Sequence, residues 1–347
     1  MPAYKDNKTN TWFCKFYYTD WQGNKKQKLK RGFTRQKDAK EWEKNFLDQF
    51  AKNPDIQFSI LYKKYKEFIT PRIRETTASS RFNMIDNHIA PYFNDMIVSE
   101  ITPADIVNWQ TEMLNKGLSD TYIHSANVYL KAIFNYAVDY LGLQKNPCNK
   151  SIGSLKTKKI DFWTPEEYKK FIEQCKDNIL YYTIFEILYY TGMRVGEVLA
   201  LTLNDIDFNK NTISINKTYY RITGKDIINP PKTDSSERTV DIPQFLSNEI
   251  KEYIKHIYNI NPSNRLFECR HQYVRTVLID RAKKAGVKVI RVHDLRHSHA
   301  SMLINLGANP LLVAKRLGHE SPEVTLKTYA HLFPDSQSEI VSKIHKA

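Results

Sequence analysis

The segment at residues 292–332, VHDLRHSHASMLINLGANPLLVAKRLGHESPEVTLKTYAHL, constrains this chain more than any other. Its apolar residues recur at helical spacing, and two glycines stand where helices would end. We therefore expect His293 and Arg296 to share one helix face, and further short helices to carry His319 and Tyr329. A guanidinium, two imidazoles and a phenol suit phosphate chemistry, because they supply a fixed cation, proton transfer and a nucleophile.

Length and charge limit the possible partners of the chain. Its 347 residues are enough for two or three domains, and its net charge of +14 favours a polyanion, either nucleic acid or an anionic membrane surface. The longest apolar run, residues 179–190, contains Glu186 and is too short to span a bilayer. The N-terminus lacks a signal-peptide core, and the four cysteines are dispersed. We therefore expect a cytoplasmic protein with no membrane partner.

Residues 1–52 are predicted to form a small separate module. Two strands, at residues 12–18 and 25–33, flank a turn, an earlier strand is possible near Tyr4, and a helix follows Thr34. A cationic face on such a sheet can enter a DNA major groove; a solvated lysine face is the alternative. The candidate DNA-binding residues of this face are Lys25, Lys26, Lys28, Lys30 and Arg31.

Residues 56–148 are predicted to be all-helical. Apolar stripes mark four helices, the second ending near Pro91 and the fourth including Val128 and Phe134. The sequence TPAD at 102–105 is a helix start, with Thr at the N-cap and Pro at the first helical position. Residues 149–161 then form a basic linker that either contacts DNA or is simply solvated, with Lys156, Lys158 and Lys159 as its candidate contacts.

Residues 162–347 are predicted to form a further domain, which begins with a capping box at Thr164. In the sequence TGMRVGE, Glu197 lies one turn after Arg194 and is placed to orient its guanidinium. One strand is expected at residues 212–219. Two more, at 227–232 and 238–242, are expected to form a hairpin with Lys232 near its tip.

The sequences HDLRH, LGH and TYAHL, with YYTGMRVGEVLALTLNDID and PPKTDSSERTVDIP upstream, resemble the boxes of the tyrosine recombinase (phage integrase) family, in the family's order. The resemblance covers the whole chain, most closely the C-terminal half. It implies a multidomain, mainly α fold with small β-sheets. Its parts are an arm-type DNA-binding domain with a small β-sheet plus helix (1–52), a four-helix core-binding, SAM-like domain (56–148), a linker (149–161), and a mixed, mostly α catalytic domain with a C-terminal tail (162–347). It assigns six catalytic residues: Arg194, Lys232, His293, Arg296, His319 and Tyr329.

The resemblance also implies the reaction. A site-specific DNA recombinase of this kind, most like integrases of temperate phages and integrative conjugative elements, cuts and rejoins strands through a 3′-phosphotyrosine intermediate. Tyr329 would attack phosphorus while the two arginines hold the non-bridging oxygens. Lys232 would protonate the leaving 5′ oxygen, His293 would accept the proton of Tyr329, and His319 would bind a phosphate oxygen. His297 has no role in this scheme.

The implied partners are double-stranded DNA with arm-type and core-type attachment sites, three further copies of the chain in a tetramer, and accessory proteins such as an excisionase and a host DNA-bending protein. The C-terminal tail, through Ile340 and Ile344, would dock either on a neighbouring subunit or on its own. No cofactor, metal ion or ATP is expected, because the covalent link conserves the phosphodiester energy.

Three alternatives remain. His293 and His297 have the i, i+4 spacing of a zinc pair, but Arg296 between them opposes a divalent cation. A type IB topoisomerase would use related chemistry to relax DNA without choosing a site. A non-catalytic DNA-binding regulator on a recombinase scaffold is disfavoured, because none of the six expected positions is substituted.

Overall fold

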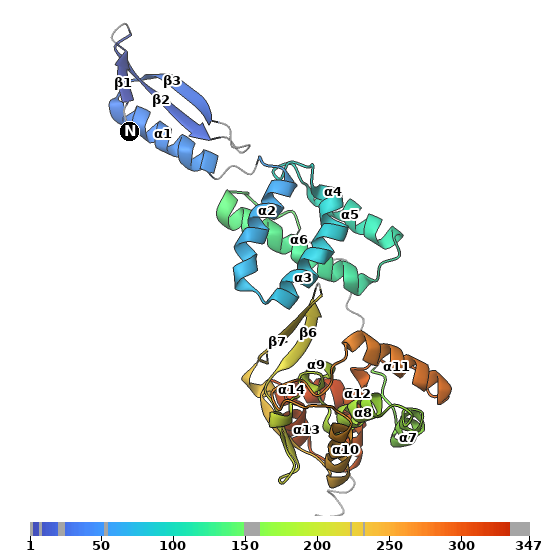
Figure 1. Ribbon diagram of the computed structural model, residues 1–347. Helices are drawn as coiled ribbons and strands as arrows, with labels where there is room; N and C mark the ends of the chain where they lie inside the picture. Colours follow the sequence, from blue (N-terminus) through green and yellow to red (C-terminus); the bar gives the residue numbers. More distant parts are fainter. Residues whose placement is uncertain are drawn as a thin grey trace, which may run out of the picture. The chain divides into compact units, whose positions relative to one another are not determined.

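A computed structural model describes residues 3–6, 9–19, 25–51, 55–148, 160–222, 224–231 and 233–333 (Figure 1). The chain divides into two compact units, Met1–Thr157 and Lys158–Ala347. Both are built mainly of helices with small antiparallel sheets, which confirms the predicted fold class. Within the described ranges, no helix has both the length and the apolar character that a bilayer crossing requires.

The N-terminal region of the first unit is a three-stranded sheet covered by one helix. Strands β1 (Ala3–Asp6), β2 (Thr11–Thr19) and β3 (Lys25–Phe33) pair antiparallel in chain order, and α1 (Gln36–Ala51) follows. Alternate residues of β2, Cys14 and Phe16, are buried, and Phe16 packs on Trp42 and Phe46 of α1. This confirms the predicted strands, including the early one at Tyr4.

The basic residues of β3 do not form the single cationic face that was expected. Lys28 pairs with Phe16 and Lys30 with Cys14, so both project toward α1, and the Lys28 ammonium lies 5.4 Å from the centre of the Phe46 ring. Arg31 instead stacks over Phe13 on the opposite, open face. The reason is the two-residue period of a strand, which sends consecutive side chains to opposite faces.

The helical part of the first unit runs from α2 (Phe58–Ile69) to α6 (Asp120–Leu141). Between them lie α3 (Glu75–Met84), a π-helical turn (Ile85–Ile89), α4 (Ala90–Phe93) and α5 (Pro103–Asn115), and the core is built around Phe58, Phe93, Trp109 and Phe134. The predicted capping box of α5 is present, with Thr102 and Asp105 bonded reciprocally. Val128, assigned to the buried stripe of α6, is instead 49% exposed.

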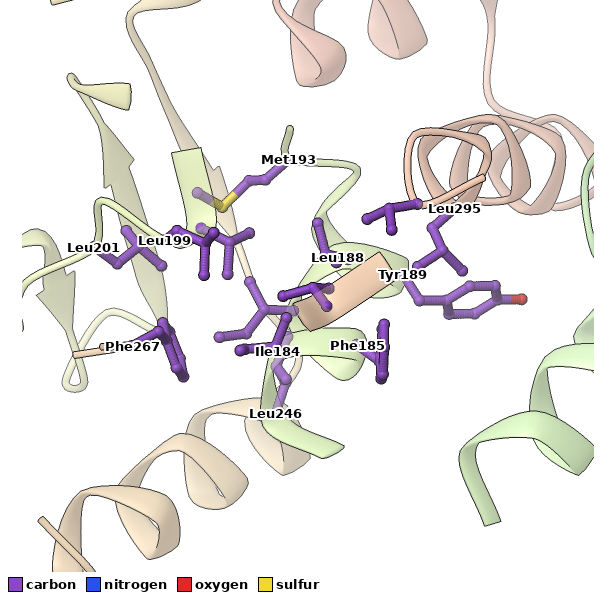
Figure 2. Close-up of a cluster of buried hydrophobic side chains, with 14 of the residues drawn as sticks. Ile184, Phe185, Leu188, Tyr189, Met193, Leu199, Leu201, Leu246, Phe267 and Leu295 are labelled. Carbon is purple, nitrogen blue, oxygen red and sulfur yellow. The ribbon is translucent and has the colours of Figure 1, made fainter. Parts of the chain in front are cut away.

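The second unit is organised around α8 (Ile179–Thr191), which is buried nearly all round as predicted (Figure 2). The helices α7 (Pro165–Glu173), α10 (Gln244–Lys255), α11 (His271–Lys284) and α12 (Asp294–Asn305) contribute to the same cluster of apolar side chains. The other α-helices among the described residues of this unit are short: α9 (Val195–Val198), α13 (Pro310–Leu317) and α14 (Pro322–Tyr329).

Strand pairing in the second unit differs from the prediction. The single strand expected at 212–219 is two strands, β5 (Thr212–Ile215) and β6 (Thr218–Ile222), in different sheets. The chain is interrupted at Asn216 and Lys217, whose side chains both bond Asp205. The hairpin expected around Lys232 does not form: β7 (Lys225–Asn229) pairs with β6, whereas β8 (Arg238–Asp241) pairs with β5, which also pairs with β4 (Ile206–Asp207).

Candidate active site

Arg296 lies at the centre of the candidate site. Its side chain, on the first turn of α12, is only 3% exposed and donates to the carbonyls of Gly192 (2.8 Å) and Leu317 (2.6 Å). These carbonyls end α8 and α13, where helix dipoles present negative charge. Burial and the nearby Arg194 lower the pKa of Arg296 to about 9, which leaves the guanidinium charged at neutral pH. One side chain thus carries a fixed cation and joins two helix ends.

Arg194 stands at the N-cap of α9 and is oriented by Glu197, at the contact that the spacing predicted. Its guanidinium donates to Glu197 Oε1 at 2.8 Å, and its backbone N–H donates to Oε2 at 2.9 Å. Arg238, which the sequence analysis did not single out, donates to the same carboxylate at 3.0 Å. Burial alone would raise the pKa of Glu197, but Arg238 and then Arg194 outweigh it and lower the pKa, so the carboxylate stays ionised.

Tyr329 closes α14 and is 2% exposed. Its hydroxyl lies 2.6 Å from Nδ1 of His297, a residue with no predicted role. Burial raises the pKa of Tyr329 to about 12, although Arg296 opposes this shift. The sequence signal that could have identified His297 is its position directly after Arg296, one helical turn beyond His293.

His293 stands one helical turn before Arg296, and the charge of Arg296 helps lower the pKa of His293, after burial and the neighbouring His297. His293 is the N-cap of α12, and its side chain is partly open to solvent, whereas Arg296 is buried within the helix. Its ring packs edge-on against the His297 ring, with 5.3 Å between centres. Among the described residues, the Tyr329 hydroxyl forms its hydrogen bond with His297 and not with His293.

His319 follows Gly318, the left-handed residue that ends α13. Its Nδ1 lies 2.7 Å from Oγ1 of Thr325, and burial, followed by the charges of Arg296 and Arg194, lowers its pKa to about 4. Gly318 is required by space as well as by conformation, because a Cβ there would lie 2.9 Å from the carbonyl oxygen of Ser235.

A cleft of about 470 Å³ opens beside these groups, and its lining includes Arg194, Pro231, Thr233 and His319. Lys217 also lines it, and both carboxylate oxygens of Asp205 hold that ammonium at 2.5 Å. The other predicted site residues lie outside the described residues: Lys232, Lys156, Lys158 and Lys159. Across the described ranges, no three His, Cys, Asp or Glu side chains gather closely enough to hold a metal ion.

Comparisons with known protein families match three regions of the chain. The phage integrase family matches residues 161–335, an arm DNA-binding domain matches residues 2–50, and the phage integrase N-terminal SAM-like domain matches residues 57–114. Relatives include the ICEBs1 integrase of Bacillus subtilis, 33% identical over 276 residues that cover 75% of each chain. The transposase of transposon Tn916 from Enterococcus faecalis is 26% identical over 301 residues, which cover 80% of this chain and 74% of the transposase.

Solved structures share the fold. The Tn1549 transposon integrase, in complex with a circular intermediate DNA, aligns with a TM-score of 0.72 at 22% identity, over 83% of this chain and 99% of that one. A lambda integrase dimer bound to a core site aligns with a TM-score of 0.62 at 15% identity, over 97% and 96% of the two chains. From the extent of the family match and the identity to the ICEBs1 integrase, this chain belongs to the phage integrase family and is a tyrosine recombinase, an enzyme that cuts and rejoins DNA strands.

Proposed function

We propose that this recombinase is the integrase of a mobile element, and that it cleaves DNA through a 3′-phosphotyrosine at Tyr329. The observation that carries the proposal is the buried guanidinium of Arg296, whose charge interacts with both Arg194 and the buried phenol of Tyr329. A phosphodiester resists attack because its oxygens are anionic, so fixed positive charge that meets the transition state lowers the barrier. The relatives named as integrases of mobile elements support the same role.

The remaining groups have complementary tasks in this proposal. His319 presents Nε2 to a phosphate oxygen, because its Nδ1 is occupied by Thr325. A lowered pKa keeps the ring neutral, so it donates one hydrogen bond and contributes no charge. Lys232, assigned from its place in the PPKTDSSER box, protonates the leaving 5′ oxygen. Replacing that oxygen by sulfur, which leaves without a proton, is expected to rescue cleavage by Lys232→Ala.

We further propose that four copies of the chain assemble on double-stranded DNA in the cytoplasm, with accessory proteins that include an excisionase and a host DNA-bending protein. A structure described as a lambda integrase tetramer bound to a Holliday junction, with a TM-score of 0.60 at 15% identity, supports the assembly. The net charge of +14 supports contact with a polyanion. Mass measurement of the complex on attachment-site DNA tests the copy number.

The DNA contacts we propose divide into two groups. In the arm-type domain, the open sheet face is available to a major groove, because α1 covers the other face; it presents Lys15, Tyr17, Lys25 and Arg31. The linker lysines Lys156, Lys158 and Lys159 are proposed as phosphate contacts from their charge alone. Replacing these lysines is expected to make the slope of log K for DNA binding against log salt concentration shallower, by about 0.9 for each phosphate contact that is lost.

The decisive experiment uses nicked suicide duplexes made from the ends of the element that encodes the chain. Wild-type protein is expected to form a protein–DNA adduct that survives SDS, and Tyr329→Phe is expected to form none, because the nucleophilic oxygen is missing. Tyr258→Phe is a matched control, since Tyr258 is 95% exposed.

Two results would contradict the proposal. A clear footprint on the same duplex without any adduct would indicate a non-catalytic regulator. Relaxation of a plasmid that lacks an attachment site, at a rate comparable to cleavage of the duplex, would indicate a topoisomerase.

A further inference from the structure

The nucleophile of this site is in direct contact with an imidazole. Nδ1 of His297 lies 2.6 Å from the hydroxyl oxygen of Tyr329, within the range in which a general base takes a proton. We propose that His297 accepts the phenolic proton of Tyr329 during strand cleavage and returns it during rejoining. This inference rests on the proposed role of Tyr329 as the nucleophile.

Burial makes a protein base necessary. Tyr329 is 2% exposed, so bulk water has little access to its hydroxyl. Across the described part of the chain, the only hydrogen bond of that hydroxyl is the one with His297. The phenol must lose its proton as the oxygen–phosphorus bond forms, and His297 is the group in position to receive it.

The other imidazoles are less suited to this task. His293 stands at the start of α12, and its ring packs against His297 rather than against Tyr329. His319 already uses Nδ1 in its bond with Thr325. The assignment of proton acceptor therefore moves by one helical turn, from His293 to His297.

The charges around His297 suit a base that is neutral at rest. Burial lowers its pKa, Arg291 and Arg296 add to that effect, and Asp294 opposes it. A neutral ring with its hydrogen on Nε2 leaves Nδ1 free to accept. Asp294, at 2% exposure, then stabilises the imidazolium that forms.

The step balances without a further reactant. The oxygen of Tyr329 bonds to phosphorus, its proton passes to Nδ1 of His297, the P–O5′ bond breaks, and the 5′ oxygen takes a proton from the general acid. Because burial raises the pKa of the phenol to about 12, the proton stays on Tyr329 until the attack begins. Rejoining reverses each transfer, and the imidazolium protonates the departing phenolate.

The test measures single-turnover cleavage of a nicked suicide duplex by His297→Ala and His297→Asn. Asparagine keeps a hydrogen bond to the phenol but is not a base, so both variants are expected to cleave about 10²–10⁴-fold more slowly than wild type. His331→Ala, an exposed histidine two residues after Tyr329, is the matched control and is expected to cleave at the wild-type rate.

A second assay removes the tyrosine proton from the reaction. In a Tyr329→Phe background, each variant joins a strand ending in a 3′-p-nitrophenyl phosphate to a 5′-hydroxyl end. The nitrophenolate leaves without a proton, so His297→Asn is expected to join at the rate of Tyr329→Phe alone. This result also shows that the variant protein folds and binds DNA.

Two results would overturn the inference. Cleavage by His297→Asn at the wild-type rate would show that a hydrogen bond suffices and no base is needed. An equal loss in cleavage and in joining would show that His297 only supports the structure. In either case the wild-type protein would still form its adduct with DNA. If the proposed function were wrong, the wild-type protein would form no adduct.

Discussion

At the scale of single residues, the carboxylate of Glu197 connects two arginines with different surroundings. Arg194 is 40% exposed and faces the cleft, whereas Arg238 is 6% exposed and lies behind the carboxylate. Arg238 also donates to the carbonyls of Ser236 and Arg316. Arg238 therefore fixes three parts of the fold relative to one another: the end of α13, the segment before β8, and Glu197, which orients Arg194.

Replacing Arg238 by Met is expected to destabilise the second unit by about 3–5 kcal/mol, because a buried carboxylate loses one of its two cations. Cleavage is also expected to slow, since Glu197 would no longer be held in place against Arg194. Urea denaturation and adduct formation measure the two effects.

Arg221→Met is the control for this prediction, because the pair of Arg221 with Asp226 is much more exposed. Arg221→Met is expected to lower the free energy of unfolding by less than about 1 kcal/mol. Equal losses in the two variants would mean that the Arg238 pair contributes no more than a surface ion pair.

At the scale of elements, helix ends bring together the groups of the candidate site. α8 and α13 both end at a left-handed glycine, Gly192 and Gly318, and Arg296 binds a carbonyl at each end. Arg194 follows Gly192 after one intervening residue, and His319 follows Gly318 directly. Glycine at these ends is predictable from the sequence, since it marks helix termini; the shared arginine is not.

Gly318→Ala is expected to cost more stability than Gly307→Ala. Both residues have positive φ, +67° and +86°, so each substitution costs about 1–2 kcal/mol for the left-handed conformation. Only at Gly318 would the new Cβ collide with other atoms, the Ser235 carbonyl and Arg238; at Gly307 nothing lies within 4 Å. Urea denaturation of both variants checks this, and equal losses would refute the steric argument.

The two faces of the sheet in the arm-type domain are expected to contribute unequally to DNA binding. Substituting Arg31 and Lys25 by Gln, on the open face, is expected to weaken binding to arm-site DNA by roughly 1–3 kcal/mol per base-reading contact. Substituting Lys28 and Lys30, on the side of α1, is expected to have less effect. Fluorescence anisotropy at fixed salt measures both pairs, and the opposite order would place DNA on the helix side.

At the scale of the whole molecule, the chain forms two units, each with its own hydrophobic core. Its net charge is +14. Composition predicted a polyanionic partner, and local patterns predicted the helices, because caps and apolar spacing act within a few residues. The capping boxes at Thr102 and Thr164 are examples, each formed with the acid three residues later. Such signals need no knowledge of the rest of the fold.

The sequence by itself determined the kind of chemistry, through the order of arginine, lysine, histidine and tyrosine boxes, and the positions of most helices. Only the tertiary structure decided which imidazole meets Tyr329, that Arg238 shares the carboxylate of Glu197, and that β7 pairs with β6 rather than with β8. The physical reason is distance along the chain. His297 and Tyr329 are 32 residues apart, and Glu197 and Arg238 are 41 apart. Such contacts depend on packing and on cross-strand hydrogen bonds, which no local pattern records.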